Sequence, residues 1–231
     1  MTPPPALVTV HVHGVPGPRV PQALWRMARD RGALAATPGL HFARLLGTGD
    51  GTTFTLRSAD PRHWALVCAW ADPGAAADFE LSRTARAWSG IAAERLLVHL
   101  RPLASRGRWS GQEPFGDPVP RQVAGPVASI TRARIRTARS LAFHRAVPAV
   151  AADLAGVDGL RLAIAIGEAP VGLQGTFSLW RSADALTDFA HRRAAHAAVV
   201  RRTPEEHWYA EELFARFEVL DVEGTYAGRV P

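Results

Sequence analysis

The chain has 231 residues, of which 47% are hydrophobic, and a formal net charge of +6, a composition typical of a globular protein with one large core or two modest ones. No apolar run approaches the roughly 20 residues that span a membrane, and the amino-terminal MTPPPALVTVHVHG lacks the features of a secretion signal, so we expect a cytoplasmic protein. All 27 basic residues are arginines scattered along the chain, which argues against a nucleic-acid interface but leaves open contact with an anionic membrane surface and assembly into an oligomer.

In chain order, the first part shows four strand patterns and two helical patterns. Pro21 stands at an early helical position, where its missing N–H is not needed, and Pro38 and Gly39 end the same helix. The single cysteine, Cys68, lies within the apolar run WALVCAW and is expected to be a buried small hydrophobe. We expect strands at 7–13, 41–46, 63–70 and 95–101, with helices at 21–36 and 74–91.

Two histidines, His11 and His13, alternate on one face of the first expected strand. Their spacing could bind a metal ion, but no Asp, Glu or Cys accompanies them at a ligand spacing. We therefore interpret them as a solvated or interface pair.

The second part of the chain repeats landmarks of the first part in the same order. We expect its strands at 127–134, 161–166, 172–180 and 212–220 and its helices at 140–154 and 183–202, the last with Ser182 as a plausible N-cap. The matching blocks are GLHFARLLGTG with GLRLAIAIGEA, ALVCAWADPGAAADF with GTFSLWRSADALTDF, and RLLVHLRPLASRGRWSG with ELFARFEVLDVEGTYAG.

Each part therefore reads as strand, helix, strand, strand, helix, strand, the order of a ferredoxin-like unit. We predict an α+β fold made by tandem duplication of this βαββαβ unit, with the two sheets forming a pseudo-dimeric α+β barrel. The first repeat covers residues 1–111, a Pro/Gly-rich linker covers 112–126, and the second repeat covers 127–231. Phe115 is expected to anchor the linker against the rest of the molecule.

The two repeats differ on the third strand. One face of this strand in the first repeat carries Trp64, Leu66, Cys68 and Trp70, and the matching face of the second repeat carries Gln174, Thr176, Ser178 and Trp180. Three hydrogen-bonding side chains at a period of two need partners if they are buried, so they either meet a polar cavity or face solvent. This asymmetry places a candidate site in the second repeat, between its sheet and its last long helix.

A histidine on that helix is the second asymmetry. His196 shares the apolar helical stripe with Leu186 and Phe189, whereas the matching position of the first repeat is Arg86. A neutral imidazole that points from a helix into an apolar space suits an axial iron ligand, and it equally suits a satisfied core histidine. We find no serine triad, paired catalytic carboxylates or P-loop, so a cofactor would have to supply difficult chemistry.

Three blocks carry a family resemblance that runs over essentially the whole chain. TPGLHFARLLGTG, LVHLRPLASRGRWSG with PFG shortly after it, and HAAVVRRTPEEHWYAEELFARFEVL resemble the spheroidene monooxygenase family, the acyclic carotenoid 2-ketolases. The resemblance implies a heme b protein that uses dioxygen and an external electron donor, such as ferredoxin, to oxygenate C2 of spheroidene and related apolar substrates. It also fits the wider group of dimeric α+β barrel heme proteins.

The resemblance implies roles for particular residues of the second repeat. His196 would ligate iron, with His191 and His207 as alternatives, and Arg193 would pair with the heme propionates. Two other functions stay open: a heme enzyme of the same fold with a small non-carotenoid substrate, using dehydratase or oxygenase chemistry, and a cofactor-free α+β barrel binding module. The implied polar contacts are Gln174, Thr176 and Ser178, and the implied apolar wall is Phe177, Trp180, Phe189 and Phe217.

Overall fold

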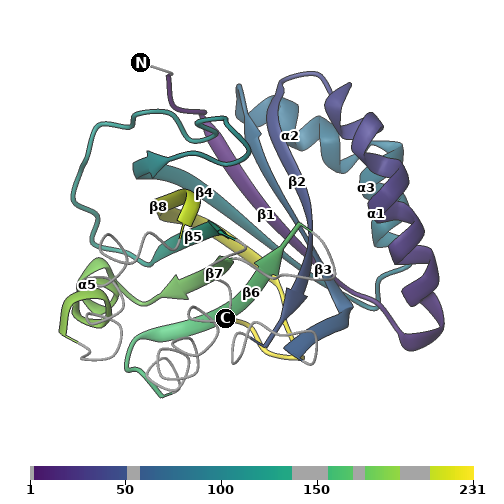
Figure 1. Cartoon of the computed structure of the whole chain (residues 1–231). Helices are drawn as coiled ribbons and strands as arrows, with labels where there is room; N and C mark the ends of the chain where they lie inside the picture. The colour runs from purple at the N-terminus through teal and green to yellow at the C-terminus, as the bar shows by residue number, and fades with distance from the viewer. Residues whose placement is uncertain (1–2, 51–57, 137–155, 169–174, 193–208) are drawn as a thin grey trace.

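The computed structural model describes residues 3–50, 58–136, 156–168, 175–192 and 209–231. Within these residues, eight antiparallel strands form a closed barrel in the order β1-β3-β2-β6-β7-β5-β8-β4 (Figure 1). The strands are β1 (Leu7–Gly14), β2 (Leu40–Gly49), β3 (Ala59–Trp70), β4 (Glu94–Gly107), β5 (Val127–Ile135), β6 (Leu160–Gly167), β7 (Gly175–Trp180) and β8 (Tyr209–Gly224).

The barrel consists of two four-stranded sheets with the same internal order. The first repeat contributes β4-β1-β3-β2 and the second contributes β8-β5-β7-β6, so equivalent strands occupy equivalent places. The sheets join through a long β4–β8 seam and a short β2–β6 seam, in which 47–49 pair with 165–167. The predicted α+β barrel of duplicated ferredoxin-like units is therefore confirmed.

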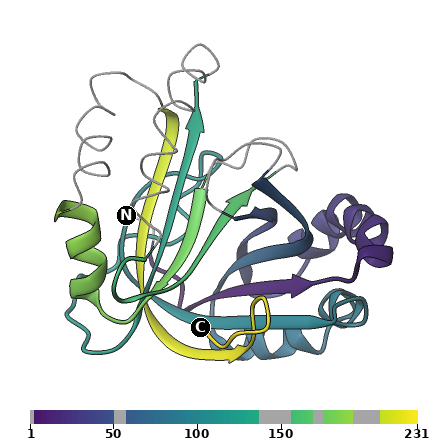
Figure 2. The ribbon, with the colours of Figure 1, turned by 90° about the horizontal axis from the view of Figure 1, so that it is seen from below.

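Helices cover the outer face of each sheet. In the first repeat these are α1 (Val20–Ala35), preceded by a 3-10 turn (Gly17–Arg19), then α2 (Pro73–Glu80) and α3 (Arg83–Ser89), which stand side by side in Figures 1 and 2. The prediction of one helix over 74–91 is wrong, because Ser82 is extended and its hydroxyl accepts the N–H of Ala85 at 3.1 Å, which starts a new helix.

In the second repeat, α5 (Ala183–Arg192) stands outside the sheet, at the far side of the barrel from α1 (Figure 2). The Ser182 hydroxyl accepts the N–H of Ala185 at 3.2 Å, which confirms the predicted N-cap. The helix expected over 140–154 and the remainder of the helix expected over 183–202 lie outside the described residues. None of the described helices combines the length and the apolar composition needed to cross a bilayer.

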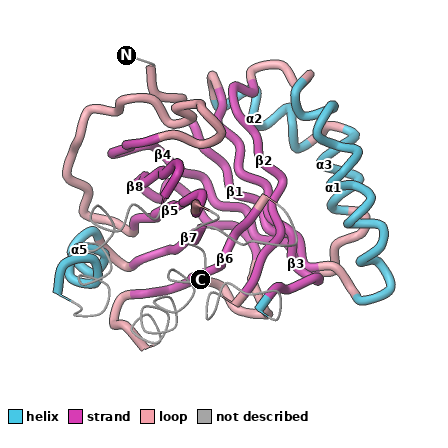
Figure 3. Tube along the Cα trace, viewed as in Figure 1, coloured by secondary structure: helices cyan, strands magenta, loops and turns pink. Residues whose placement is uncertain are grey.

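Side chains that point into the barrel form one continuous core, so its interior is packed (Figure 3 shows the strands that enclose it). This core draws on both repeats, for example Val98 on β4 and Ile130 on β5, which are both fully buried. Phe115 of the linker is also fully buried and meets the ring of Phe217 edge to face at 4.9 Å. Phe115 therefore anchors the linker, as predicted.

Two glutamates at matching positions each hold the turn that follows the last strand of the other repeat. Glu211, at the start of β8, accepts the two backbone N–H groups of the 110–111 turn at 2.8 and 2.7 Å. Glu94, at the start of β4, accepts those of the 227–228 turn at 3.0 and 2.7 Å. We call these contacts the Glu211 clasp and the Glu94 clasp. Their reciprocity shows that the duplication extends to individual hydrogen bonds.

His63 connects the Glu94 clasp to Asp60. Its Nδ1 lies 2.5 Å from Asp60 Oδ2 and its Nε2 lies 3.2 Å from Glu94 Oε2. The hydrogen bond to Asp60 raises the pKa of His63 and outweighs the lowering effect of burial. The folded protein therefore holds this proton more tightly than the unfolded chain does. The resulting stabilisation is complete below the ordinary pKa of about 6.5 and is lost as the pH rises through the raised pKa.

We accordingly expect His63 to make the free energy of unfolding fall as the pH rises from about 6.5 into the alkaline range, and the substitution His63→Gln to flatten this fall. Urea denaturation of both proteins across that range measures the effect. Burial lowers the pKa values of His11 and His13 to about 3, so these two residues add stability as the pH rises toward their unfolded pKa of about 6.5 and change little above it. Their contribution is the same in both proteins, so the comparison isolates His63. An unchanged slope in His63→Gln would show that other groups carry the pH dependence.

His11 and His13 are buried, with only 3% and 5% of their surface exposed, so the interpretation as a solvated or interface pair is wrong. Helices α2 and α3 cover them: His11 meets the ring of Phe79 at 5.8 Å and His13 meets Trp88 at 5.5 Å. Burial lowers the pKa of each imidazole to about 3, so both rings are neutral near pH 7. Cys68 is fully buried, as predicted.

Candidate functional site

A ladder of hydroxyl groups lies on the outer face of the second-repeat sheet. Ser178 on β7 stands opposite Ser129 on β5, and their Oγ atoms are 2.8 Å apart. Thr176 stands opposite Thr131 in the same way, with 2.6 Å between the Oγ1 atoms. The predicted need for partners is thus met by hydroxyls from the neighbouring strand. In each pair, one hydroxyl donates its hydrogen to the oxygen of the other. The second hydroxyl of the pair therefore keeps a hydrogen that this bond does not use.

Two aromatic rings border this ladder. Trp180 follows Ser178 on the same face of β7, and its Nε1 donates to the Ser178 Oγ at 2.8 Å. Phe189 on α5 packs against the Trp180 indole with a centroid distance of 5.2 Å. Both residues are buried, and they form a small apolar cluster separate from the barrel core. The ladder therefore has a rigid apolar border on the side of α5.

The remaining predicted site residues do not all join this surface. Phe177 and Phe217 point into the barrel core, so they lie behind the sheet and cannot share one wall with Trp180 and Phe189. The physical reason is the alternation of side chains along a strand, which sends Phe177 to the face opposite its two neighbours. Gln174, Arg193, His196 and His207, together with the side chain of His191, lie outside the described residues.

Sequence reasoning missed Ser129 and Thr131. Both come from β5, and a single strand gives no indication of which residues stand opposite on the next strand. The duplication held a usable signal, because Thr9 and His11 of β1 occupy the equivalent places opposite β3. Transferring the strand register of the first repeat to the second would have paired Ser129 with Ser178 and Thr131 with Thr176.

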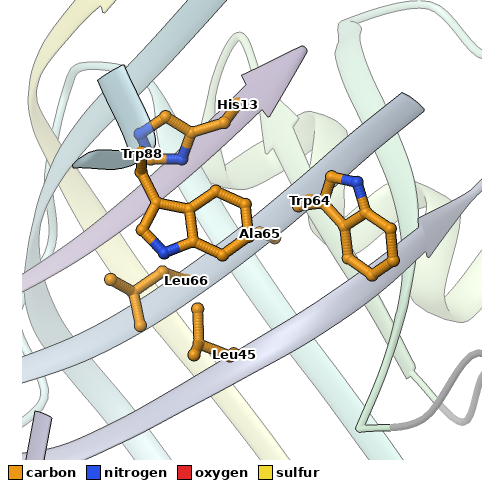
Figure 4. Close-up of a pocket in the computed structure, with 6 residues that line it drawn as sticks. All are labelled: His13, Leu45, Trp64, Ala65, Leu66 and Trp88. Carbon is orange, nitrogen blue, oxygen red and sulfur yellow. The ribbon is translucent and has the colours of Figure 1, made fainter. Parts of the chain in front are cut away.

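The equivalent surface of the first repeat is filled by large side chains. Figure 4 shows a hollow between β1, β2, β3 and α3, in which Trp64, Trp88 and His13 gather around Leu45 and Leu66. The hollow is too tight to hold a water molecule. All five residues are buried, which makes this region of the first repeat part of its core.

Every residue that lines this hollow has a smaller counterpart in the second repeat. The pair Leu45 and Leu66, opposite each other on β2 and β3, matches the pair Ala165 and Thr176 on β6 and β7. The same alignment pairs the two tryptophans with much smaller residues. The six replacements are His13 with Ala133, Leu45 with Ala165, Trp64 with Gln174, Ala65 with Gly175, Leu66 with Thr176, and Trp88 with Ala198. The side chains at these six positions therefore have less total volume in the second repeat than in the first.

A buried charge cluster lies at the end of the barrel, on the other face of the sheet. Arg132, whose side chain is only 7% exposed, pairs with Glu211 and, at 3.2 Å, with Glu168. Burial tends to raise the pKa of the Glu211 carboxyl, but the backbone N–H groups of its clasp and Arg132 outweigh this and hold the pKa below its usual value. Burial lowers the pKa of the half-buried Arg44. The positive charges of Arg44 and Arg132 balance the negative charges of Glu168 and Glu211, so we interpret this cluster as part of the barrel structure.

The fold and the candidate site together define a class. Two ferredoxin-like repeats closed into one barrel make this an α+β barrel protein, and the hydroxyl ladder on the outer face of the second-repeat sheet is its candidate ligand site. The solved structure of an aldoxime dehydratase in complex with butyraldoxime has the same fold: its TM-score is 0.59, with 12% identity over 94% of this chain and 81% of that one.

Sequence comparison identifies the family. Spheroidene monooxygenase of Rhodobacter capsulatus is 35% identical over 218 residues, which cover 92% of this chain and 89% of that protein. Spheroidene monooxygenase of Rubrivivax gelatinosus is 36% identical over 193 residues, covering 83% of this chain and 73% of that protein. No protein-family model matches the chain. The chain belongs to the spheroidene monooxygenase family.

Proposed function

We propose that the protein is a heme-dependent monooxygenase that oxygenates C2 of a spheroidene-type acyclic carotenoid with dioxygen. The observation that carries the activity is the 35% identity to spheroidene monooxygenase over 92% of the chain. The two electrons that a monooxygenation consumes would come from an external donor such as ferredoxin.

Two features of the second repeat's sequence support a heme site. The six positions that fill the first repeat all carry smaller residues in the second repeat, which would leave space next to the sheet for this group. His196 follows α5 in the chain, in place of Arg86 of the first repeat, so the second repeat alone offers an imidazole at this position. A bound heme would supply the activation of dioxygen, which ordinary side chains do not provide.

The side chains around this space would each have a defined task. His196 would hold the iron, and Arg193 would pair with a propionate. The ladder hydroxyls of Thr176 and Ser178, with Gln174, would donate hydrogen bonds to polar atoms at the site. Trp180 and Phe189 would form the apolar border and exclude water, since the indole is already fixed by its hydrogen bond to Ser178.

The test is hemin titration of the purified protein, followed by its Soret band. We expect His196→Ala to lose the band or shift it strongly, and His191→Ala and His207→Ala, in the same segment, to bind hemin as the unaltered protein does. A carotenoid assay with dioxygen and a reducing system then tests the substrate, because mass spectrometry detects an added oxygen atom.

Two outcomes would contradict the proposal in different ways. A protein that takes up no hemin and stays colourless would favour a cofactor-free binding module. A red protein that leaves acyclic carotenoids unchanged but converts a small substrate would keep the heme site and remove the carotenoid activity.

A further inference from the structure

The outward face of α1 has an unusual composition for a helix that faces water. Trp25 is 51% exposed and Leu24 is 45% exposed. The remaining exposed positions of the helix are proline, alanine, glycine and two arginines, Arg29 and Arg31. The single acidic residue of the helix, Asp30, is buried and pairs with Arg26 at 3.4 Å. The face that α1 presents outward is thus apolar and positive, with no negative group.

The exposed tryptophan and its neighbouring arginine act as a unit. The Arg29 guanidinium lies over the Trp25 indole, 4.6 Å from the ring centroid. This cation–π contact holds a positive charge directly beside an exposed aromatic ring. Trp25, Leu24 and Arg29 therefore form one amphipathic patch on the ridge of the helix.

Helix α3, which packs against α1, extends the positive charge. It contributes the exposed Arg83 and Arg86, and its sequence RTARAWS contains no acidic residue. Figures 1 and 2 place both helices at the outer edge of the molecule, on the side away from α5. The surface of α1 and α3, here called the α1–α3 face, can thus meet a flat partner without obstruction from the barrel.

We propose that the α1–α3 face docks on the surface of an anionic phospholipid bilayer. Tryptophan prefers the boundary between headgroups and acyl chains, and arginines are attracted by anionic lipid. Apolar side chains on a helix ridge can enter roughly 5–10 Å of the headgroup region without a matching cavity. A folded protein partner would have to provide a pocket for Trp25. This inference is independent of the proposed heme site.

The test is co-sedimentation of the full chain with extruded vesicles of phosphatidylcholine alone and of phosphatidylcholine with phosphatidylglycerol. We expect binding to the anionic vesicles only, weakening as salt is added. Trp25→Ser should reduce the partition coefficient roughly tenfold, because a large apolar side chain no longer inserts. Arg29→Gln should reduce it about fivefold, which corresponds to one arginine charge near the surface.

Matched variants elsewhere on the surface control for general stickiness and charge. Val119→Ser removes an apolar side chain that is 85% exposed on the linker, and Arg134→Gln removes an exposed charge on β5. Both should bind vesicles as the unaltered protein does. Circular dichroism of each variant confirms folding, which these exposed substitutions should preserve.

A difference fluorescence spectrum between the unaltered protein and Trp25→Ser isolates the Trp25 signal, which should shift to the blue on anionic vesicles. Equal binding to both vesicle types would overturn the proposal, as would an unaltered partition coefficient for Trp25→Ser. Absence of vesicle binding together with saturable, salt-sensitive binding to a purified acidic protein such as ferredoxin would reassign the face to a protein partner.

Discussion

The double substitution of Ala165 and Thr176 by leucine should abolish hemin uptake while leaving the fold intact. Leucine is the residue at both matching positions of the first repeat, Leu45 and Leu66, and the two pairs hold the same register in their sheets. The change therefore refills the second repeat with side chains that this fold already accommodates. The measurements are the Soret titration and the thermal melting curve of the hemin-free protein.

The stability of the hemin-free variant makes this result specific. If the second repeat holds space for a ligand, two added leucines enter that space and the melting temperature should stay the same or rise. If the region is already packed, they overfill a core, which costs about 1–3 kcal/mol. A clear loss of stability with unchanged hemin uptake would therefore contradict the site.

The reciprocal substitution in the first repeat is the control. Leu45→Ala with Leu66→Thr removes buried apolar groups from a packed region, where each large-to-small change costs about 2–5 kcal/mol. Both leucines are less than 7% exposed, so the cavity cannot collapse easily. This variant should be less stable but, at a temperature where it is folded, should take up hemin normally.

The sequence predicted the duplicated barrel because duplication leaves landmarks at long range. Phe79 on α2 packs on Trp70 and Phe189 on α5 packs on Trp180, with ring centroids 5.3 and 5.2 Å apart, so residues matched by alignment meet matched partners in space. The predicted strand positions followed from the same blocks. Local pattern alone would not have distinguished a barrel from two separate sheets.

Other features depend on partners that one strand or helix does not reveal. His11 and His13 alternate with apolar residues as a solvated pair would, yet α2 and α3 cover them. The resemblance places Phe177 and Trp180 in one apolar wall, but residues three positions apart on a strand face opposite sides of the sheet, and these two lie in different apolar clusters. Predicting the hydroxyl ladder requires the pairing register of β5 and β7, which neither strand shows alone. Predicting the helix break at Ser82 requires knowing that its side chain caps a new helix and does not continue the first one.

The substitution Glu211→Ala should destabilise the fold by about 3–5 kcal/mol, the usual cost of removing one partner from a buried ion pair. Its carboxylate binds Arg132 and accepts the two N–H groups of the 110–111 turn. Without it, the guanidinium of Arg132 remains buried beside Glu168, a partner that is itself more exposed. Urea denaturation at pH 7 measures the change in the free energy of unfolding.

The Glu94 clasp provides a matched comparison within the same molecule. Glu94 fastens the equivalent turn with the same two backbone contacts, but its charged neighbour is His63, which can release its proton and keep its contact with Asp60. Glu94→Ala therefore leaves unpaired hydrogen-bond donors without a stranded permanent charge, which should cost about 1–3 kcal/mol. Equal losses for the two variants would mean that the turn contacts, and not Arg132, dominate.

A double variant separates the charge from the turn. Arg132→Met combined with Glu211→Gln removes the buried positive charge and keeps an oxygen that can accept an N–H from the 110–111 turn. Because replacing a whole buried ion pair by neutral groups is often close to neutral, this protein should be more stable than Glu211→Ala alone. If it is equally unstable, the cost lies in lost packing around Trp109, whose ring lies 5.8 Å from the Arg132 guanidinium.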